Sequence, residues 1–455
     1  MFASTVSASP PNIVHIIVDD LGWNDVGFHG SEIKTPAIDR LAAESVVLDR
    51  FYVTPICSPT RAGVLTGRYP FRFGIWDGVV TPTKRHGLPP SELTTAELLA
   101  KAGYEHRIML GKWHLGLAST QFHPLNHGFT HFYGHYNGAI DYFSRQRSGQ
   151  LDWHRDFQTI RETGYSTDLI GNAAVKFVHS HSGSSPFYMV VAFNAPHSPI
   201  QAKQDDLTAC GFDPTGKRAP NTVKNIAKRE NALDYGEGRK GNSVRQTFAA
   251  MVRSLDQNVG RILNTLDDRG LRENTIVLLH SDNGGIPRHG GNNKPLRGNK
   301  FTTWEGGVRV VAMIRWPNQL RGGTKFESIS AYIDVFPTLA AAAGIPIPSH
   351  VDGVNLLPFL NGVEPPPRML LLGENTVVSD QWKLKADEFF DLKHDPSETR
   401  PVDTPPIEVR AVMRERLAIF AELRGPQTVS MLPKPTSWPP VDWQLPAETQ
   451  SAQKQ

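Results

Sequence analysis

Ionisable and amide side chains follow four short apolar runs of this sequence, each directly after the run ends. They are Asp19 and Asp20 after 13–18, Lys112 and His114 after 107–110, His197 after 187–193, and Asp282 and Asn283 after 276–279. Any one of them has an ordinary interpretation, since Asp and Asn are common in helix caps and turns. Four at equivalent places favour one shared site, because ligands of open α/β sheets bind beyond the carboxyl ends of the strands.

These residue types divide into two kinds of chemistry. Oxygen donors make up the first group: Asp19, Asp20, Asp282 and Asn283. Such ligands suit Ca²⁺, Mg²⁺ or Mn²⁺ rather than structural zinc, and three crowded carboxylates without a cation would raise one another's pKa. Cationic and acid–base groups make up the second: Lys112, His114, His197 and Lys300. A dication beside such groups is suited to a tetrahedral oxyanion ester, either phosphate or sulfate.

A candidate nucleophile lies in the stretch 57–68, C-S-P-T-R-A-G-V-L-T-G-R. Pro59 near the first helical position predicts that Cys57 and Ser58 open a helix. Such an N-terminus attracts anions and lowers the pKa of a thiol, and Arg61, one turn onward, can reach the same spot. A lone cysteine before a helix is usually a buried structural residue, but the polar set around it favours catalysis.

The apolar runs that carry these side chains predict the fold. They are continuous rather than alternating, which is typical of strands buried on both faces of a sheet. Between the last two runs, residues 248–266 place apolar side chains three and four residues apart, and Gly270 supplies a stop signal, so we expect a helix there. The fold class is therefore α/β, with a large, mostly parallel sheet between layers of helices.

The sequence pattern changes near residue 358. A strand at 369–372, an alternating stretch at 381–392 and a helix at 407–423 predict a smaller α+β domain over 358–425, packed on a catalytic domain of 1–357. The Pro-rich tail 426–455 is expected to be loosely held. The segment 199–245 lacks periodicity and is long enough to be a lid or a binding loop.

Composition excludes several classes of protein. With 39% hydrophobic and 20% charged residues, the chain can build a large core and is not disordered. A net charge of +3 is too near balance to indicate nucleic acid or a membrane as the main partner. No apolar stretch approaches the ~18 residues of a membrane span. The first residues carry no readable secretion signal, and two cysteines cannot form a disulfide scaffold.

The stretch C-S-P-T-R resembles the C-x-P-x-R signature of the formylglycine-dependent sulfatases, a family within the alkaline phosphatase-like superfamily. In that family the cysteine is oxidised to formylglycine, whose hydrated gem-diol attacks sulfur. The resemblance covers most of the chain through the blocks 18–30, 111–116, 193–199, 281–285 and 290–309. The blocks 18–30 and 290–309 are most similar to arylsulfatase B, the N-acetylgalactosamine-4-sulfatase group.

The resemblance implies a role for each member of the polar set. The implied calcium ligands are Asp19, Asp20, Asp282 and Asn283, with the modified Cys57 completing the shell. Arg61 and Lys112 would orient the gem-diol, and His114 would be the base that collapses the sulfated hemiacetal. His197 and Lys300 would bind the sulfate and assist the leaving alcohol. A maturation enzyme that oxidises Cys57 is implied as a partner.

Substrate and localisation are expected from the same resemblance. The segment 136–143 is similar to a family segment that lines the pocket, so we predict that Asp141 and Tyr142 bind a sulfated sugar or aryl ester, although its aromatics could equally pack under a loop. His29 and Trp304 are further pocket candidates. The absence of a disulfide framework favours a bacterial-type member, periplasmic or cytoplasmic.

Two alternatives remain open at this stage. A phosphonate monoester hydrolase or phosphodiesterase of the same superfamily would share the metal site and the nucleophile. A non-catalytic, metal-stabilised binding protein would keep Cys57 unmodified.

Overall fold

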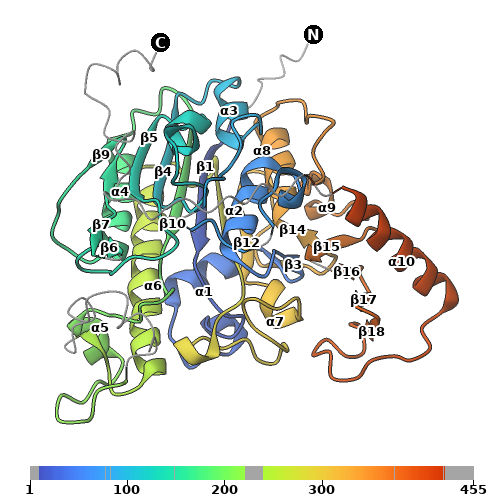
Figure 1. The fold of residues 1–455 in the computed structure, drawn as a ribbon. Coiled ribbons are helices and arrows are strands. Elements are labelled where there is room, and N and C mark those ends of the chain that lie inside the picture. Colours follow the sequence, from blue (N-terminus) through green and yellow to red (C-terminus); the bar gives the residue numbers. More distant parts are fainter. Residues whose placement is uncertain are drawn as a thin grey trace, which may run out of the picture.

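The computed structural model describes residues 10–423 and 425, apart from 77, 82–83, 148, 221–238 and 374. A ten-stranded sheet forms its centre (Figure 1). In spatial order the strands are β13 (Thr324–Phe326), β2 (Val46–Leu48), β12 (Ala312–Arg315), β11 (Thr275–Ser281), β1 (Asn12–Val18), β10 (Phe187–Phe193), β4 (His106–Lys112), β5 (His131–His135), β8 (His154–Arg155) and β9 (Gln158–Thr159).

The middle of this sheet is parallel and buried. The neighbours β11, β1, β10, β4 and β5 pair in parallel, whereas β12 and β8 join them in antiparallel fashion. Every residue of β10 and β11 is buried, as continuous apolar runs predict. All four predicted strands of the sheet are present, and the α/β fold class is confirmed.

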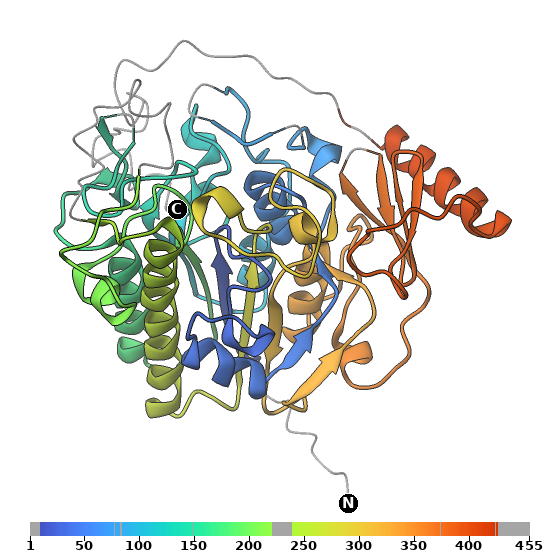
Figure 2. The same ribbon diagram turned by 90° about the horizontal axis from the view of Figure 1, so that it is seen from below.

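Helices cover both faces of the sheet (Figures 1 and 2). On one face lie α1 (Pro36–Ala43), α4 (Ser166–Ser180) and α6 (Val244–Asp268); on the other lie α2 (Cys57–Thr66), α3 (Thr95–Ala100) and α8 (Val335–Ala342). Side chains of β1 alternate between these layers, because successive residues of a strand point to opposite faces. Val14 and Ile16 belong to the core under α6, whereas Ile13 and Ile17 belong to the core under α2. The predicted helix over 248–266 is the centre of α6, and Gly270 follows its end with φ +65°.

A second, antiparallel sheet lies at one side of the molecule, coloured orange to red in both views. It consists of β15 (Leu370–Gly373), β16 (Thr376–Val378), β17 (Trp382–Lys385) and β18 (Glu388–Asp391), and α10 (Ile407–Glu422) packs against it. The alternating stretch 381–392 contains the two strands β17 and β18. The predicted boundary between residues 357 and 358 falls inside α9 (Leu357–Leu360), and the tail 426–455 lies outside the described residues.

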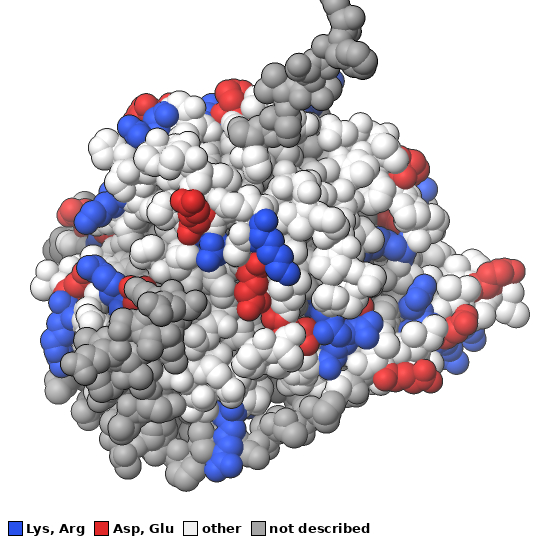
Figure 3. Space-filling model, turned by 90° about the horizontal axis from the view of Figure 1, so that it is seen from above, with Lys and Arg blue, Asp and Glu red and all other residues white. Residues whose placement is uncertain are grey.

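Smaller elements complete the described chain: β3 (Phe51–Tyr52) with β14 (Ser330–Ala331), β6 (Gln146–Arg147) with β7 (Gln150–Leu151), and α7 (Glu305–Val308). The segment 199–245 contains a short helix, α5 (Gln204–Ala209), and its residues 221–238 lie outside the described part. Among the described helices, none has the length and apolarity needed to cross a bilayer. On the face in Figure 3, side chains of both signs lie interspersed.

Candidate active site

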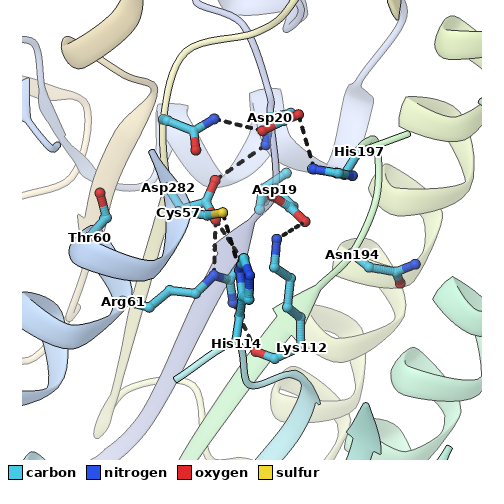
Figure 4. Close-up of polar contacts among 12 residues, drawn as sticks. Asp19, Asp20, Cys57, Thr60, Arg61, Lys112, His114, Asn194, His197 and Asp282 are labelled. Carbon is cyan, nitrogen blue, oxygen red and sulfur yellow. Dashed lines mark hydrogen bonds and ion pairs between the residues drawn. The ribbon is translucent and has the colours of Figure 1, made fainter. Parts of the chain in front are cut away.

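The polar residues that follow four separate strands meet at one edge of the central sheet (Figure 4). Asp19 and Asp20 follow β1, Asp282 and Asn283 follow β11, His197 follows β10, and Lys112 ends β4. Since β11, β1, β10 and β4 are consecutive neighbours running in parallel, their carboxyl ends lie side by side. The strand order therefore brings these residues together, as the sequence pattern predicted.

Each of the three carboxylates lies against a cation. Lys112 Nζ lies 2.6 Å from Asp19 Oδ2, and Lys300 Nζ lies 2.6 Å from Asp20 Oδ1. Arg61 donates to Asp282 Oδ2 from Nε at 3.0 Å and from Nη2 at 2.8 Å. All six side chains are buried. The pairing offsets much of the mutual repulsion expected from three carboxylates in a small volume.

Cys57 begins α2, with Ile56 as the preceding cap residue, so Pro59 is the third helical residue. The Cys57 Sγ atom lies 3.2 Å from His114 Nδ1, and Ser58 Oγ donates to the His114 carbonyl oxygen at 2.9 Å. The expectation of a lowered thiol pKa is wrong: burial raises the pKa of Cys57, and this outweighs the nearby ammonium groups of Lys112 and Lys300.

Three oxygen atoms at the centre of the site are suited to a metal ion. Asp19 Oδ1, Asp20 Oδ2 and Asn283 Oδ1 are buried and have no hydrogen-bond partner. Ligand atoms of Asp19, Cys57 and Asp282 lie within 4.8 Å of one another, as do those of Asp19, Asp20 and His197. Unsatisfied buried oxygens are costly, and carboxylate and amide oxygens are the donors that hard divalent cations prefer. The residues present therefore fit such an ion.

Burial and neighbouring charges set the protonation of the site. Burial raises the pKa of Asp19, whereas for Asp20 the charge and hydrogen bond of Lys300 overcome burial and lower the pKa. Burial also lowers the pKa values of His114 and His197, and nearby lysines add to the effect. Both imidazoles are consequently neutral at pH 7, the form that can accept a proton.

Two site residues adopt a backbone conformation that is rare outside glycine. Asp20 has φ +62° and His114 has φ +59°, and Phe301, next to Lys300, has φ +74°. Left-handed conformations of this kind cost free energy and persist where the surrounding structure enforces them, often at functional sites. Sequence reasoning singled out Asp20 and His114 but missed Phe301.

Gly138 is a second residue that sequence reasoning missed. A Cβ atom on Gly138 would lie 2.4 Å from Cε1 and 2.5 Å from Nε2 of His114, so only glycine leaves room for this ring. The one available signal was a glycine inside the aromatic segment 136–143.

Asp141 and Tyr142, the predicted substrate-binding residues of segment 136–143, form hydrogen bonds with other residues of the protein. Asp141 accepts from Gln201 Nε2 at 2.6 Å and from the backbone N–H of Phe143 at 2.9 Å. Tyr142 Oη lies 2.7 Å from the carbonyl oxygens of Asn194 and His197, so it holds the loop that carries His197. Their contact with substrate stays a prediction.

The other two pocket candidates, His29 and Trp304, take no part in these hydrogen bonds. His29 stacks on Trp23 at 4.1 Å between ring centroids, and its Nδ1 lies 2.7 Å from the Trp23 carbonyl oxygen. Trp304 borders a cavity at the C-terminal sheet.

Comparison with known proteins places this geometry in a family. Residues 11–345 match the family model named Sulfatase. The N-acetylgalactosamine-6-sulfatase of Mus musculus is 34% identical over 379 residues, covering 77% of this chain and 66% of that protein. Arylsulfatase J of Mus musculus is 33% identical, covering 75% of this chain and 54% of that protein. The chain thus spans less than two thirds of the length of these curated relatives.

A solved structure matches over nearly the whole chain. The crystal structure of Ps i-CgsB in complex with k-i-k-neocarrahexaose is 30% identical, with a TM-score of 0.80, and the match covers 97% of this chain and 99% of that one. The chain belongs to the sulfatase family, which confirms the resemblance inferred from the C-x-P-x-R stretch.

Proposed function

We propose that this protein is a sulfuric ester hydrolase that acts on a sulfated saccharide through a formylglycine derived from Cys57. The observation that carries the proposal is the 3.2 Å contact between Cys57 Sγ and His114 Nδ1 inside a ring of buried cations. The Sγ atom marks the position of the oxygen on Cβ of a formylglycine. The hydrated form of that residue supplies the hydroxyl that attacks sulfur.

Each surrounding side chain has a role that follows from its position. His114 Nδ1 can accept a proton at position 57, because its imidazole is neutral and within hydrogen-bond reach. Lys112 and Lys300 border the same space and can neutralise charge on the sulfate oxygens, and the neutral imidazole of His197 can offer a hydrogen bond there. Arg61 spans Asp282 and the Lys112 carbonyl oxygen, and so fixes the two strand ends relative to α2.

The implied metal would be held by four residues: Asp19, Asp20, Asp282 and Asn283. A divalent cation there supplies Lewis-acid polarisation of a sulfate oxygen. The hard oxygen donors favour Ca²⁺, with Mg²⁺ and Mn²⁺ as the other candidates. Conversion of Cys57 requires an oxidising maturation enzyme as a partner.

The sugar specificity is inferred from relatives. N-acetylgalactosamine-6-sulfatase is named for a sulfated amino sugar, and Ps i-CgsB is described with a neocarrahexaose. Both names support a saccharide ester over a simple aryl ester.

Turnover of 4-nitrophenyl sulfate against bis(4-nitrophenyl) phosphate tests the reaction class. We expect the sulfate ester to be cleaved faster. Faster cleavage of the phosphodiester would favour the phosphodiesterase alternative and contradict the proposal. Absence of both activities in protein whose Cys57 stays unmodified would favour the binding-protein alternative.

A further inference from the structure

A cavity of about 480 Å³ lies between the catalytic site and the C-terminal sheet. Residues 54–56, directly before Cys57, and 301–304, directly after Lys300, form one wall. Residues 371–373 of β15 and Lys385 of β17 also line the cavity. Its volume falls in the range of ~300–1,000 Å³ that is usual for ligand pockets. The cavity is therefore lined by close sequence neighbours of Cys57 and Lys300, but not by Cys57 or Lys300 themselves.

Phe301 presents an exposed aromatic ring to this cavity. Its side chain is 61% exposed, the largest such fraction for an aromatic residue in the described chain, and its φ is +74°. The Phe301 N–H donates to the Pro55 carbonyl oxygen at 2.8 Å, which fixes this conformation. Its ring centroid lies 5.5 Å from Lys300 Nζ, the ammonium that pairs with Asp20. A bulky residue kept in a strained and exposed position beside a reactive group is suited to contact a ligand.

Lys385 supplies a positive charge to the cavity. Two cations lie over the Trp304 ring, whose centroid is 3.7 Å from Arg297 Cζ and 4.7 Å from Lys385 Nζ. Arg297 donates to the Glu398 carbonyl oxygen at 2.7 Å. Within the described part of the chain, neither cation forms an ion pair with a carboxylate, and this includes Glu388, the cross-strand neighbour of Lys385. Among the described residues, the ammonium of Lys385 therefore remains available to an anionic ligand in the cavity.

We propose that this cavity is a subsite for a second ring of the substrate, and that this ring carries a sulfate of its own. The apolar face of the ring lies against Phe301, and its sulfate lies at Lys385. This inference rests on the proposed sulfatase function and deepens it, because it makes the substrate an extended saccharide with sulfate on successive rings.

Inhibition of 4-nitrophenyl sulfate turnover tests the subsite. The two probes are a galactose trisaccharide with one sulfate on each ring and the same trisaccharide sulfated on its terminal ring alone. We expect the fully sulfated probe to inhibit the full-length protein at least tenfold more strongly. In Lys385→Gln that difference should fall to less than threefold, whereas the exposed Lys393→Gln of the same domain should retain it.

Replacement of Phe301 tests the ring contact separately from the charge. Phe301→Gly accommodates the left-handed backbone and removes only the ring. It should weaken inhibition by both trisaccharides at least tenfold relative to N-acetylgalactosamine 6-sulfate, and Phe301→Tyr should restore it. Ile407→Ala, which removes an exposed apolar side chain on α10, serves as the control.

Two results would overturn the subsite: equal inhibition by the two trisaccharides in the unmodified chain, or a difference that survives in Lys385→Gln. A protein with converted Cys57 that cleaves neither 4-nitrophenyl sulfate nor N-acetylgalactosamine 6-sulfate would instead contradict the proposed function. In that case calorimetric titration with the same two probes decides the subsite independently, by the same tenfold criterion.

Discussion

Gly138 lies against the imidazole of His114, and the two residues belong to different segments that meet at the active site. A methyl group at position 138 would overlap the ring by more than an ångström, so the ring would have to leave its present position beside Cys57. Gly138 is thus a positioning residue, since it acts through His114 rather than on the substrate. Its φ lies outside the left-handed region, so an alanine would meet no backbone strain.

Gly138→Ala should therefore lower kcat strongly while the protein stays folded. Displacement of a catalytic group by about 1 Å can cost ~100-fold in rate. Steady-state kinetics with 4-nitrophenyl sulfate should show the loss mainly in kcat. Gly260→Ala in α6, where the new Cβ meets only Ala37 Cβ at 3.0 Å, is the control. A folded Gly138→Ala protein with unchanged kcat would contradict this positioning role.

Lys383 of β17 connects the C-terminal sheet to α7 through buried ion pairs. Its Nζ lies 3.1 Å from Glu305 Oε1 in α7 and 2.8 Å from Glu398 Oε1, and all three residues are fully buried. Because removal of one partner leaves buried charges uncompensated, Lys383→Met should lower the free energy of unfolding by about 3–5 kcal/mol. Denaturant titration measures this change, and adding Glu398→Gln should recover part of it. A loss as small as that of the exposed Lys393→Met would show that the ion pairs do not stabilise the contact between the C-terminal sheet and α7.

Buried neutral histidines should make the protein sensitive to acid. Burial lowers the pKa of His123 and of His135 to about 3. Their folded pKa values lie below the unfolded value of ~6.5, so their contribution to stability is complete above ~6.5 and is lost as the pH falls toward 3. Each should add about 1.4 kcal/mol per pH unit to the slope of stability against pH in that window.

Denaturant titration between pH 7 and pH 5 measures this slope. His123→Gln should make the slope shallower, whereas the exposed His131→Gln should leave it unchanged. A slope in His123→Gln equal to that of the unmodified chain would refute the assignment to His123.

A divalent cation should stabilise the fold through the three unpartnered oxygens of the site. At a free concentration of 100 times Kd, a ligand that binds only the folded state adds about 2.7 kcal/mol. The thermal midpoint should rise when Ca²⁺ is added after treatment with a chelator, and the rise should be smaller in Asn283→Ala. Identical midpoints with Ca²⁺, Mg²⁺, Mn²⁺ and chelator would speak against a metal site here.

The sheet and the convergence of the polar residues could be predicted because both follow from local pattern. Buried parallel strands read as continuous apolar runs, and the residue after each run must lie at the carboxyl edge. The raised thiol pKa of Cys57 could not be predicted, since it depends on how deeply α2 is buried. The contact of Gly138 with His114 and the Lys383 ion pairs depend on packing between distant segments, which no local pattern encodes.

The mass of the peptide that contains Cys57 tests the central claim most directly. Conversion of –CH₂SH to –CHO loses sulfur and two hydrogens and gains oxygen, so the mass should fall by about 18 Da. In active protein we expect this lighter peptide, and Cys57→Ala should have no sulfatase activity. Full sulfatase activity in a preparation whose Cys57 peptide carries the unmodified thiol mass would contradict the account.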